Sequence, residues 1–156
     1  CAGNAEKKRL KAEVDDLEAI LFGDTSAMPD RTLAMQAIQA YENYANAVPG
    51  DTLSPEYLYK GAELAMNMQM PGKAIEYYDR IQNNYPDFDK ISYCLFLQAF
   101  IYENQMQQFE TAKKIYQKFI DNYPEHPLAD DAQVSLQNMG KTIEELIESW
   151  EAQEQK

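Results

Sequence analysis

The chain of 156 residues contains a single histidine, which limits the acid–base and metal chemistry it could perform. His126 lies in the segment 124–127 with no serine or cysteine nearby to serve as its nucleophile, so we interpret it as a turn residue. Adjacent carboxylates occur at Asp15-Asp16, Asp87/Asp89, Asp130-Asp131 and Glu144-Glu145, but 26 acidic residues make such pairs inevitable. No glycine-rich phosphate loop, zinc-ligand spacing or calcium loop is present. The sequence therefore predicts no enzyme activity, no metal site and no cofactor.

The two cysteines have different surroundings. Cys94 lies in the apolar run 93–97, where we expect a small buried side chain and no disulfide with Cys1. Cys1 precedes a short polar stretch, and residues 1–5 are expected to be a flexible tether.

Composition narrows the class of partner. The chain has 14 basic and 26 acidic residues, a formal net charge of −12, which repels a phosphate backbone, so no nucleic acid is expected as a partner. Its hydrophobic content of 45%, with 11 tyrosines, is that of a folded domain rather than of a disordered acidic chain.

One helical pattern recurs three times. A small residue is followed at +4 by tyrosine, at +7 by a large apolar residue and at +12 by proline, which ends the helix. The three copies are Ala37, Tyr41, Tyr44 and Pro49; Ala74, Tyr78, Ile81 and Pro86; and Ala112, Tyr116, Phe119 and Pro124.

A second helix precedes the small residue in two of these copies. It carries Tyr57, Gly61 and Leu64 in one copy and Leu95, Ala99 and Tyr102 in the other, a small residue between two large ones. Short connections make the paired helices antiparallel neighbours. The fold class predicted is all-α: an α-solenoid of antiparallel helix pairs, with about eight helices in roughly three repeats plus capping helices.

These two helix pairs, each with its closing proline, resemble the tetratricopeptide repeat family in their order of aromatic, small, large, small, aromatic and apolar residues. The spacings of 37 and 38 residues between copies exceed the family's 34. Longer repeats that end in Tyr-Pro are similar to those of tetratricopeptide lipoproteins of Gram-negative envelopes. The resemblance covers residues 31–140 and implies a scaffold that binds proteins.

The ends of the array are predicted to be helices within a single domain, residues 6–156. Residues 6–30 form an N-terminal helix and loop, residues 31–140 the repeats, and residues 141–156 a C-terminal capping helix. Gly140 ends the preceding helix, and Thr142 with Glu145 forms a capping box. The buried stripe of the capping helix is expected to be Ile143, Leu146, Ile147 and Trp150.

Two interpretations stay open for the N-terminal helix. Its stripe Leu10, Val14, Leu17 and Leu21 could enter a short coiled coil or pack on the helix 31–48, which we favour. The basic residues Lys7, Lys8, Arg9 and Lys11 could attract anionic lipid or simply be solvated.

Cys1 is expected to carry a lipid, because envelope lipoproteins, which the repeats resemble, begin with a lipidated cysteine once the signal peptide is removed. Acyl chains would then hold the domain on a membrane, at about 0.8 kcal/mol per buried methylene. The alternative is that Cys1 is an arbitrary end of the sequence.

The resemblance also implies where a partner binds, since the first helix of each tetratricopeptide repeat lines a concave groove. By register, the outward residues are Tyr59, Ala62, Met66, Tyr93, Phe96, Leu97, Phe100, Glu103 and Asn104. The alternative is that these aromatic residues belong to the core. A further alternative places the site at the acidic loops 49–54, 87–89 and 125–127.

The sequence thus predicts a non-catalytic, lipid-anchored scaffold of the bacterial envelope, on the periplasmic side of the outer membrane. Its groove would bind a peptide or segment of an envelope protein. The alternative is a structural envelope protein that self-associates into a homo-oligomer, and an enzyme or a carbohydrate-binding protein comes third.

Overall fold

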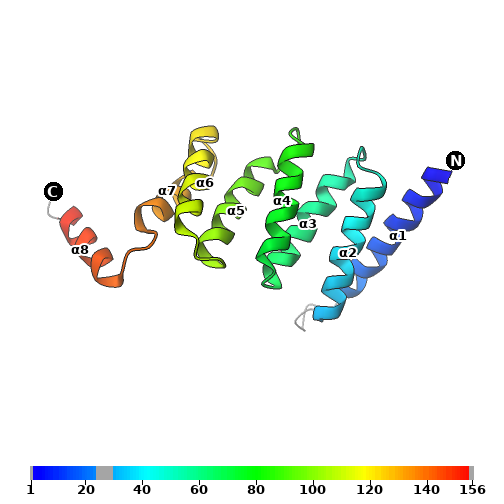
Figure 1. The fold of residues 1–156 in the computed structure, drawn as a ribbon, viewed down its shortest axis with the longest axis horizontal. Coiled ribbons are helices and arrows are strands. Elements are labelled where there is room, and N and C mark those ends of the chain that lie inside the picture. Colours follow the sequence, from blue (N-terminus) through cyan, green and yellow to red (C-terminus); the bar gives the residue numbers. More distant parts are fainter. Residues whose placement is uncertain (1, 24–29, 155–156) are drawn as a thin grey trace. The chain divides into compact units, whose positions relative to one another are not determined.

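The computed structural model describes residues 2–23 and 30–154, and in these ranges it contains eight helices and no strand (Figure 1). This confirms the predicted all-α fold of paired helices. The helices are α1 (Ala2–Gly23), α2 (Arg31–Ala47), α3 (Leu53–Asn67), α4 (Pro71–Asn84), α5 (Ile91–Asn104), α6 (Phe109–Asn122), α7 (Ala129–Asn138) and α8 (Ile143–Glu154). No helix of the described residues is long and apolar enough to cross a bilayer.

The chain divides into two compact units, Cys1–Cys94 and Leu95–Lys156. The single domain expected for residues 6–156 stays a prediction. The tether expected for residues 1–5 is wrong over residues 2–5, which are already helical. Gly3 and Asn4 lie in the first turn of α1, where both residue types are better tolerated than in a helix interior.

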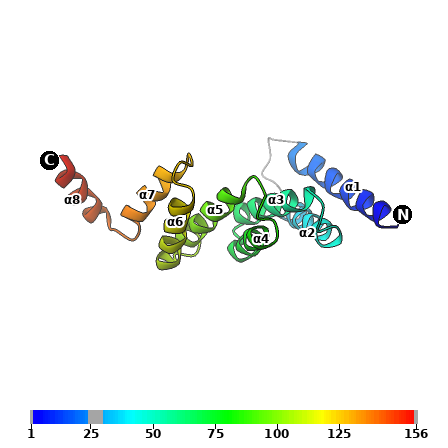
Figure 2. The same cartoon turned by 90° about the horizontal axis from the view of Figure 1, so that it is seen from above.

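In the first unit, α1 to α4 pack against one another in chain order (Figures 1 and 2). Leu10, Val14 and Leu21 of α1 are buried and Leu17 is half-buried, as expected if α1 packs on α2. The short connections 48–52 and 68–70 turn the chain back on itself, which makes α2, α3 and α4 successive antiparallel neighbours.

Tyrosine rings fill the core of this unit. Tyr41 and Tyr57 stack with centroids 5.5 Å apart, and Tyr44 meets Tyr57 edge-on at 4.8 Å. Gly61 lets α3 approach α4, since an added Cβ would lie only 2.9 Å from the Tyr77 ring. The Ala–Tyr pattern of the repeats therefore marks the faces where helices meet.

Carboxylates accept hydrogen bonds from several of these buried phenols. Tyr41 donates to Glu18 at 2.9 Å, Tyr44 to Asp51 at 3.1 Å and Tyr77 to Glu42 at 2.9 Å. Burial and these carboxylates raise the pKa of each phenol.

The second unit has a smaller core, made by α5, α6 and α7. Its buried residues are Leu95, Ala99, Ala112, Tyr116, Phe119, Ala132 and Met139. Phe96 packs on this cluster, with its ring centroid 5.5 Å from Tyr116 and 5.4 Å from Phe119.

The predicted start of the C-terminal helix is confirmed, but the prediction that its apolar stripe is buried is wrong. Gly140 has φ +76°, and Thr142 and Glu145 exchange the two capping hydrogen bonds at 2.8 and 3.2 Å. Ile143, Ile147 and Trp150, however, are exposed, and Leu146 is only half-buried. The core cluster of this unit includes Ala132 and Met139 but no residue of α8, so the apolar face of α8 has no buried surface to pack on.

Candidate functional site

The predicted groove residues of α3 lie mostly in the core. Tyr59 is buried against Tyr78 and Phe88, with centroids 5.8 and 6.0 Å apart, and Ala62 is fully buried. Assigning these two residues to an open groove is therefore wrong, and the alternative that aromatic residues belong to the core holds for Tyr59. The tight packing of α3 between its neighbours buries this side of the helix. Only Met66 is half-exposed.

The predicted groove residues of α5 have different environments. Tyr93, in the first unit, is exposed. In the second unit Phe100 and Asn104 are exposed, Leu97 is half-buried and Phe96 packs on the core. Glu103 accepts a hydrogen bond from Tyr116 at 2.9 Å, and Asn104 donates to the Phe100 carbonyl at 3.0 Å. Phe96 and Glu103 therefore support the structure of their unit.

A cleft in the first unit brings Met66 together with residues that the sequence analysis missed. It has a volume of about 490 Å³ and is lined by Phe22, Tyr41, Lys60, Glu63, Leu64, Met66 and Asn67. Phe22, near the end of α1, is 57% exposed, so its ring is available to a ligand. The cleft thus combines an exposed ring, a thioether and both signs of charge.

One wall of the cleft is held by Glu18. Its carboxylate accepts hydrogen bonds from Tyr41 at 2.9 Å and from Lys60 at 2.8 Å. The Lys60 ammonium also lies 5.7 Å from the centroid of the Tyr57 ring. Lys60 is therefore already neutralised and positioned before any ligand arrives.

Glu63 differs from Lys60, because it makes no hydrogen bond or ion pair with any of the described residues. It is half-buried, and burial raises the pKa of its carboxyl, an effect that Lys90 opposes and Glu56 reinforces. A partly desolvated acceptor without a partner gains most from a donor that a ligand supplies. Glu63 lies one residue after Ala62, so a register shifted by one position would have found it.

Two of the acidic loops suggested by the sequence form a second hollow. It has a volume of about 610 Å³ and is lined by Pro49–Thr52, Pro55, Glu56 and Asn84–Asp89. Asp51 is bound by Lys7, Tyr44 and the Leu53 amide, and Lys7 is the main reason that its pKa is lowered. Glu56 pairs with Lys90 at 2.9 Å. Half of the carboxylates here therefore serve the fold.

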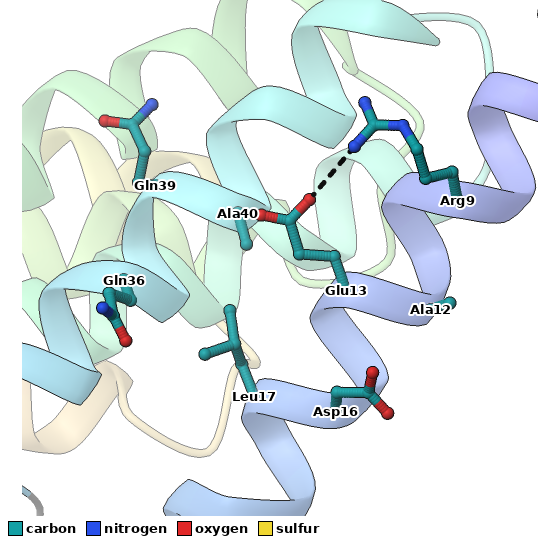
Figure 3. Close-up of a pocket in the computed structure, with 8 residues that line it drawn as sticks. All are labelled: Arg9, Ala12, Glu13, Asp16, Leu17, Gln36, Gln39 and Ala40. Atoms are coloured by element: carbon teal, nitrogen blue, oxygen red, sulfur yellow. Dashed lines mark ion pairs between the residues drawn. The ribbon is translucent and has the colours of Figure 1, made fainter.

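A third hollow, between α1 and α2, is lined mainly by polar and charged side chains (Figure 3). Glu13 is directed toward Arg9 on the preceding turn, 3.5 Å away, while Leu17 and Ala40 lie between the helices (Figure 3). Lys7 and Lys11 likewise pair with Asp51 and Asp15. Carboxylates therefore bind three of the four basic residues that were considered for lipid attraction.

The remaining chemical candidates have structural roles. His126 accepts a hydrogen bond from the Leu128 amide at 3.1 Å, and its ring meets Phe119 edge-on at 5.2 Å, in the turn that leads into α7. Cys94 is free and fully buried, as expected, and burial raises the pKa of its thiol to about 12. Cys1 lies outside the described residues.

Antiparallel helices that pack on their neighbours in chain order, as α1 to α4 do within the first unit, are typical of a helical-repeat protein. More specifically, a family model described as tetratricopeptide repeat matches residues 56–87 and 93–126, so the segments α3–α4 and α5–α6 are similar to two such repeats. The remaining predicted copy, residues 37–49, covers the second half of α2 and the turn after it, and it lies outside the match. No curated protein matches the chain. Repeats of this kind suggest a protein-interaction scaffold, generally a non-catalytic one.

Proposed function

We propose that this protein binds a segment of a partner protein in the cleft formed by Phe22, Lys60, Glu63 and Met66. The observation that carries the proposal is Glu63, a half-buried carboxylate beside the exposed Phe22 ring that has no hydrogen-bond or ion-pair partner among the described residues. A volume of about 490 Å³ holds a few side chains rather than a folded domain.

The lining predicts the chemistry of the bound segment. An apolar side chain fits between Phe22 and Met66, where it removes both from water. A backbone N–H or a basic side chain fits beside Glu63. Because Lys60 is already paired with Glu18, the free charge of the cleft is negative, and an acidic segment is disfavoured.

Site-specific photo-crosslinking tests the cleft. A photoreactive amino acid is placed at Phe22 or at Met66 in cells, and crosslinked peptides are identified by mass spectrometry. Ile20 is the matched control, since it is also an exposed apolar residue of α1 but does not line the cleft. Both cleft positions are expected to crosslink to the same partner segment, and Glu63→Gln is expected to reduce that yield. Equal crosslinking from Ile20 contradicts the proposal.

The cellular setting is a separate part of the proposal: a lipid on Cys1 holds the scaffold to the outer membrane of a bacterial envelope, facing the periplasm. The resemblance of the repeats to those of envelope lipoproteins supports it. Metabolic labelling with an alkynyl fatty acid is expected to mark the protein made from its full-length precursor and not a Cys1→Ser variant. Equal labelling of the two, or none in either, rejects the anchor.

The alternative of a self-associating structural protein makes a different prediction. A homo-oligomer has a multiple of the 17.9 kDa chain mass at micromolar concentration, whereas the scaffold proposed here is a monomer. Sedimentation equilibrium distinguishes them.

A further inference from the structure

The C-terminal helix α8 exposes an apolar face. Ile143, Ile147 and Trp150 are 73%, 44% and 54% exposed, and their spacing of four and three residues places them on one side of the helix. Val134 of α7 is also 54% exposed. These four residues, which we call the α8 stripe, are a surface that the second unit leaves in water.

The opposite side of α8 makes few contacts with its unit. Leu146 and Ser149 are half-buried, and the Ser149 hydroxyl donates to the Leu146 carbonyl of its own helix at 2.7 Å. A helix of 12 residues is marginal in water without an apolar face packed on something else. Apolar side chains gathered on one exposed face mark an interaction surface.

A hollow beside the stripe gives it a shape that can receive a side chain. It lies between α7 and α8, has a volume of about 470 Å³, and is lined by Val134, Gln137, Asn138, Lys141, Ser149, Trp150 and Gln153. An apolar side chain inserted there would contact Val134 and the Trp150 ring.

Charge identifies the occupant. Glu144, Glu148 and Glu151 recur at the same spacing as the stripe and form a row beside it, and α8 contains no lysine or arginine. A membrane-surface helix normally carries basic residues on its polar face, so anionic lipid is disfavoured. A second copy would bring two rows of glutamates together in chains of net charge −12.

We infer that the α8 stripe is a docking surface for an amphipathic helix of a partner protein, with an apolar face flanked by lysine or arginine. Its apolar residues cover Ile143, Ile147 and Trp150, and its basic residues pair with the glutamate row. This surface belongs to the second unit and does not depend on the proposed function of the cleft.

The only tryptophan of the chain reports directly on this surface. The probe is a synthetic amphipathic helix of leucine and lysine. The controls are a peptide of the same composition in shuffled order and one with glutamate in place of lysine. The amphipathic Leu–Lys peptide is expected to shift Trp150 emission to shorter wavelength and to bind at least tenfold more tightly than either control, with an affinity that falls as salt rises.

Two variants divide the contributions. Ile143→Ser/Ile147→Ser is expected to weaken binding at least tenfold, with the melting temperature nearly unchanged because both residues are exposed. Glu144→Gln/Glu151→Gln leaves the apolar face intact and is expected to lower both the affinity and its salt dependence. Ile20→Ser is the matched control for loss of an exposed apolar residue, and Phe22→Ser separates this surface from the cleft; both should bind the peptide as the original chain does.

Three outcomes overturn the inference. If the shuffled peptide binds as tightly as the amphipathic one, the binding depends only on net charge. A dimer by sedimentation that disappears in Ile143→Ser/Ile147→Ser assigns the stripe to a second copy. A blue shift of Trp150 with phosphatidylglycerol vesicles, and none with the Leu–Lys helix, assigns it to a membrane.

Discussion

Replacing Gly61 by alanine tests how closely α3 and α4 approach. The added Cβ would lie 2.9 Å from Cε2 and 3.1 Å from Cδ2 of Tyr77, and 3.6 Å from Cδ2 of Tyr41. The Tyr77 ring cannot easily move, since it is fully buried and its hydroxyl donates to Glu42 at 2.9 Å. Lys73 holds both partners, with its ammonium 3.0 Å from Glu42 and 4.7 Å from the ring centroid.

The size of the effect follows from opposing contributions. Alanine in a helix interior is favoured over glycine by about 1 kcal/mol. Overpacking a filled core costs about 1–3 kcal/mol, and weakening the hydrogen bond to a charged acceptor costs about 1–3 kcal/mol more. We therefore expect Gly61→Ala to lower the free energy of unfolding by about 1–5 kcal/mol.

Urea unfolding followed by circular dichroism measures this change. Gly72→Ala is the matched control, because Gly72 is also helical, in the first turn of α4, and nothing lies within 4 Å of its added Cβ. The control should be neutral or stabilised by up to about 1 kcal/mol. In a Tyr77→Leu background, Gly61→Ala should lower the free energy of unfolding by less than it does in the original chain. If Gly61→Ala is as stable as the original chain, the close approach of α3 and α4 is refuted.

Four further predictions follow from burial and charge. Trp150→Ala should change the free energy of unfolding by less than about 1 kcal/mol because the ring is half exposed, whereas Phe119→Ala should lower it by about 3–5 kcal/mol because that ring is fully buried. Similar losses for the two variants in urea titrations would contradict the exposure of α8. Phe96→Ser should lower the melting temperature clearly and Phe100→Ser only slightly, and equal melting temperatures would show that both rings share one environment. Burial raises the pKa of Tyr44 and Tyr57 from 10.0 to about 12, so the stability that the two neutral phenols contribute is complete below pH 10 and is lost between pH 10 and 12. Tyrosinate absorbance and loss of helicity should therefore rise together in this range. Phenols that ionise well before the helices unfold would argue against this burial. In a Cys1→Ser variant Cys94 should react with thiol reagents only as fast as the protein opens, because its thiol is buried with a pKa raised to about 12, and rapid labelling of the folded protein would exclude that burial.

Helices and their pairing were predictable because local signals and periodicity specify them. Each closing proline ends a helix within two residues, at Ala47, Asn84 and Asn122. The capping box at Thr142 formed because its two hydrogen bonds link residues three apart and need no distant partner. The burial of Cys94 and of the α1 stripe followed from apolar patterning in the same way.

The candidate site was predicted only in part, because a groove depends on how far each helix is rotated toward its neighbours. Successive residues of a helix differ by about 100° in direction, so an error of one position replaces a surface residue by a core residue. Tyr59 and Ala62 proved to be core, while Glu63 lies at the cleft. Phe22 reaches this cleft from a helix about 40 residues away in sequence, which no local pattern could indicate.

By itself, then, the sequence determined which segments are helical, where most of them end and that each carries an apolar face. Hydrogen-bonding and apolar periodicity act over three or four residues, and those distances can be read along the chain. Only the tertiary structure decided which apolar faces are covered. The stripe of Ile143, Ile147 and Trp150 is as regular as the buried stripe of α1. Leu10 and Val14 are buried where α1 packs on α2, whereas none of the helices described in the second unit covers the stripe on α8. Burial needs a second surface at the right place, and only the packing of the helices supplies it.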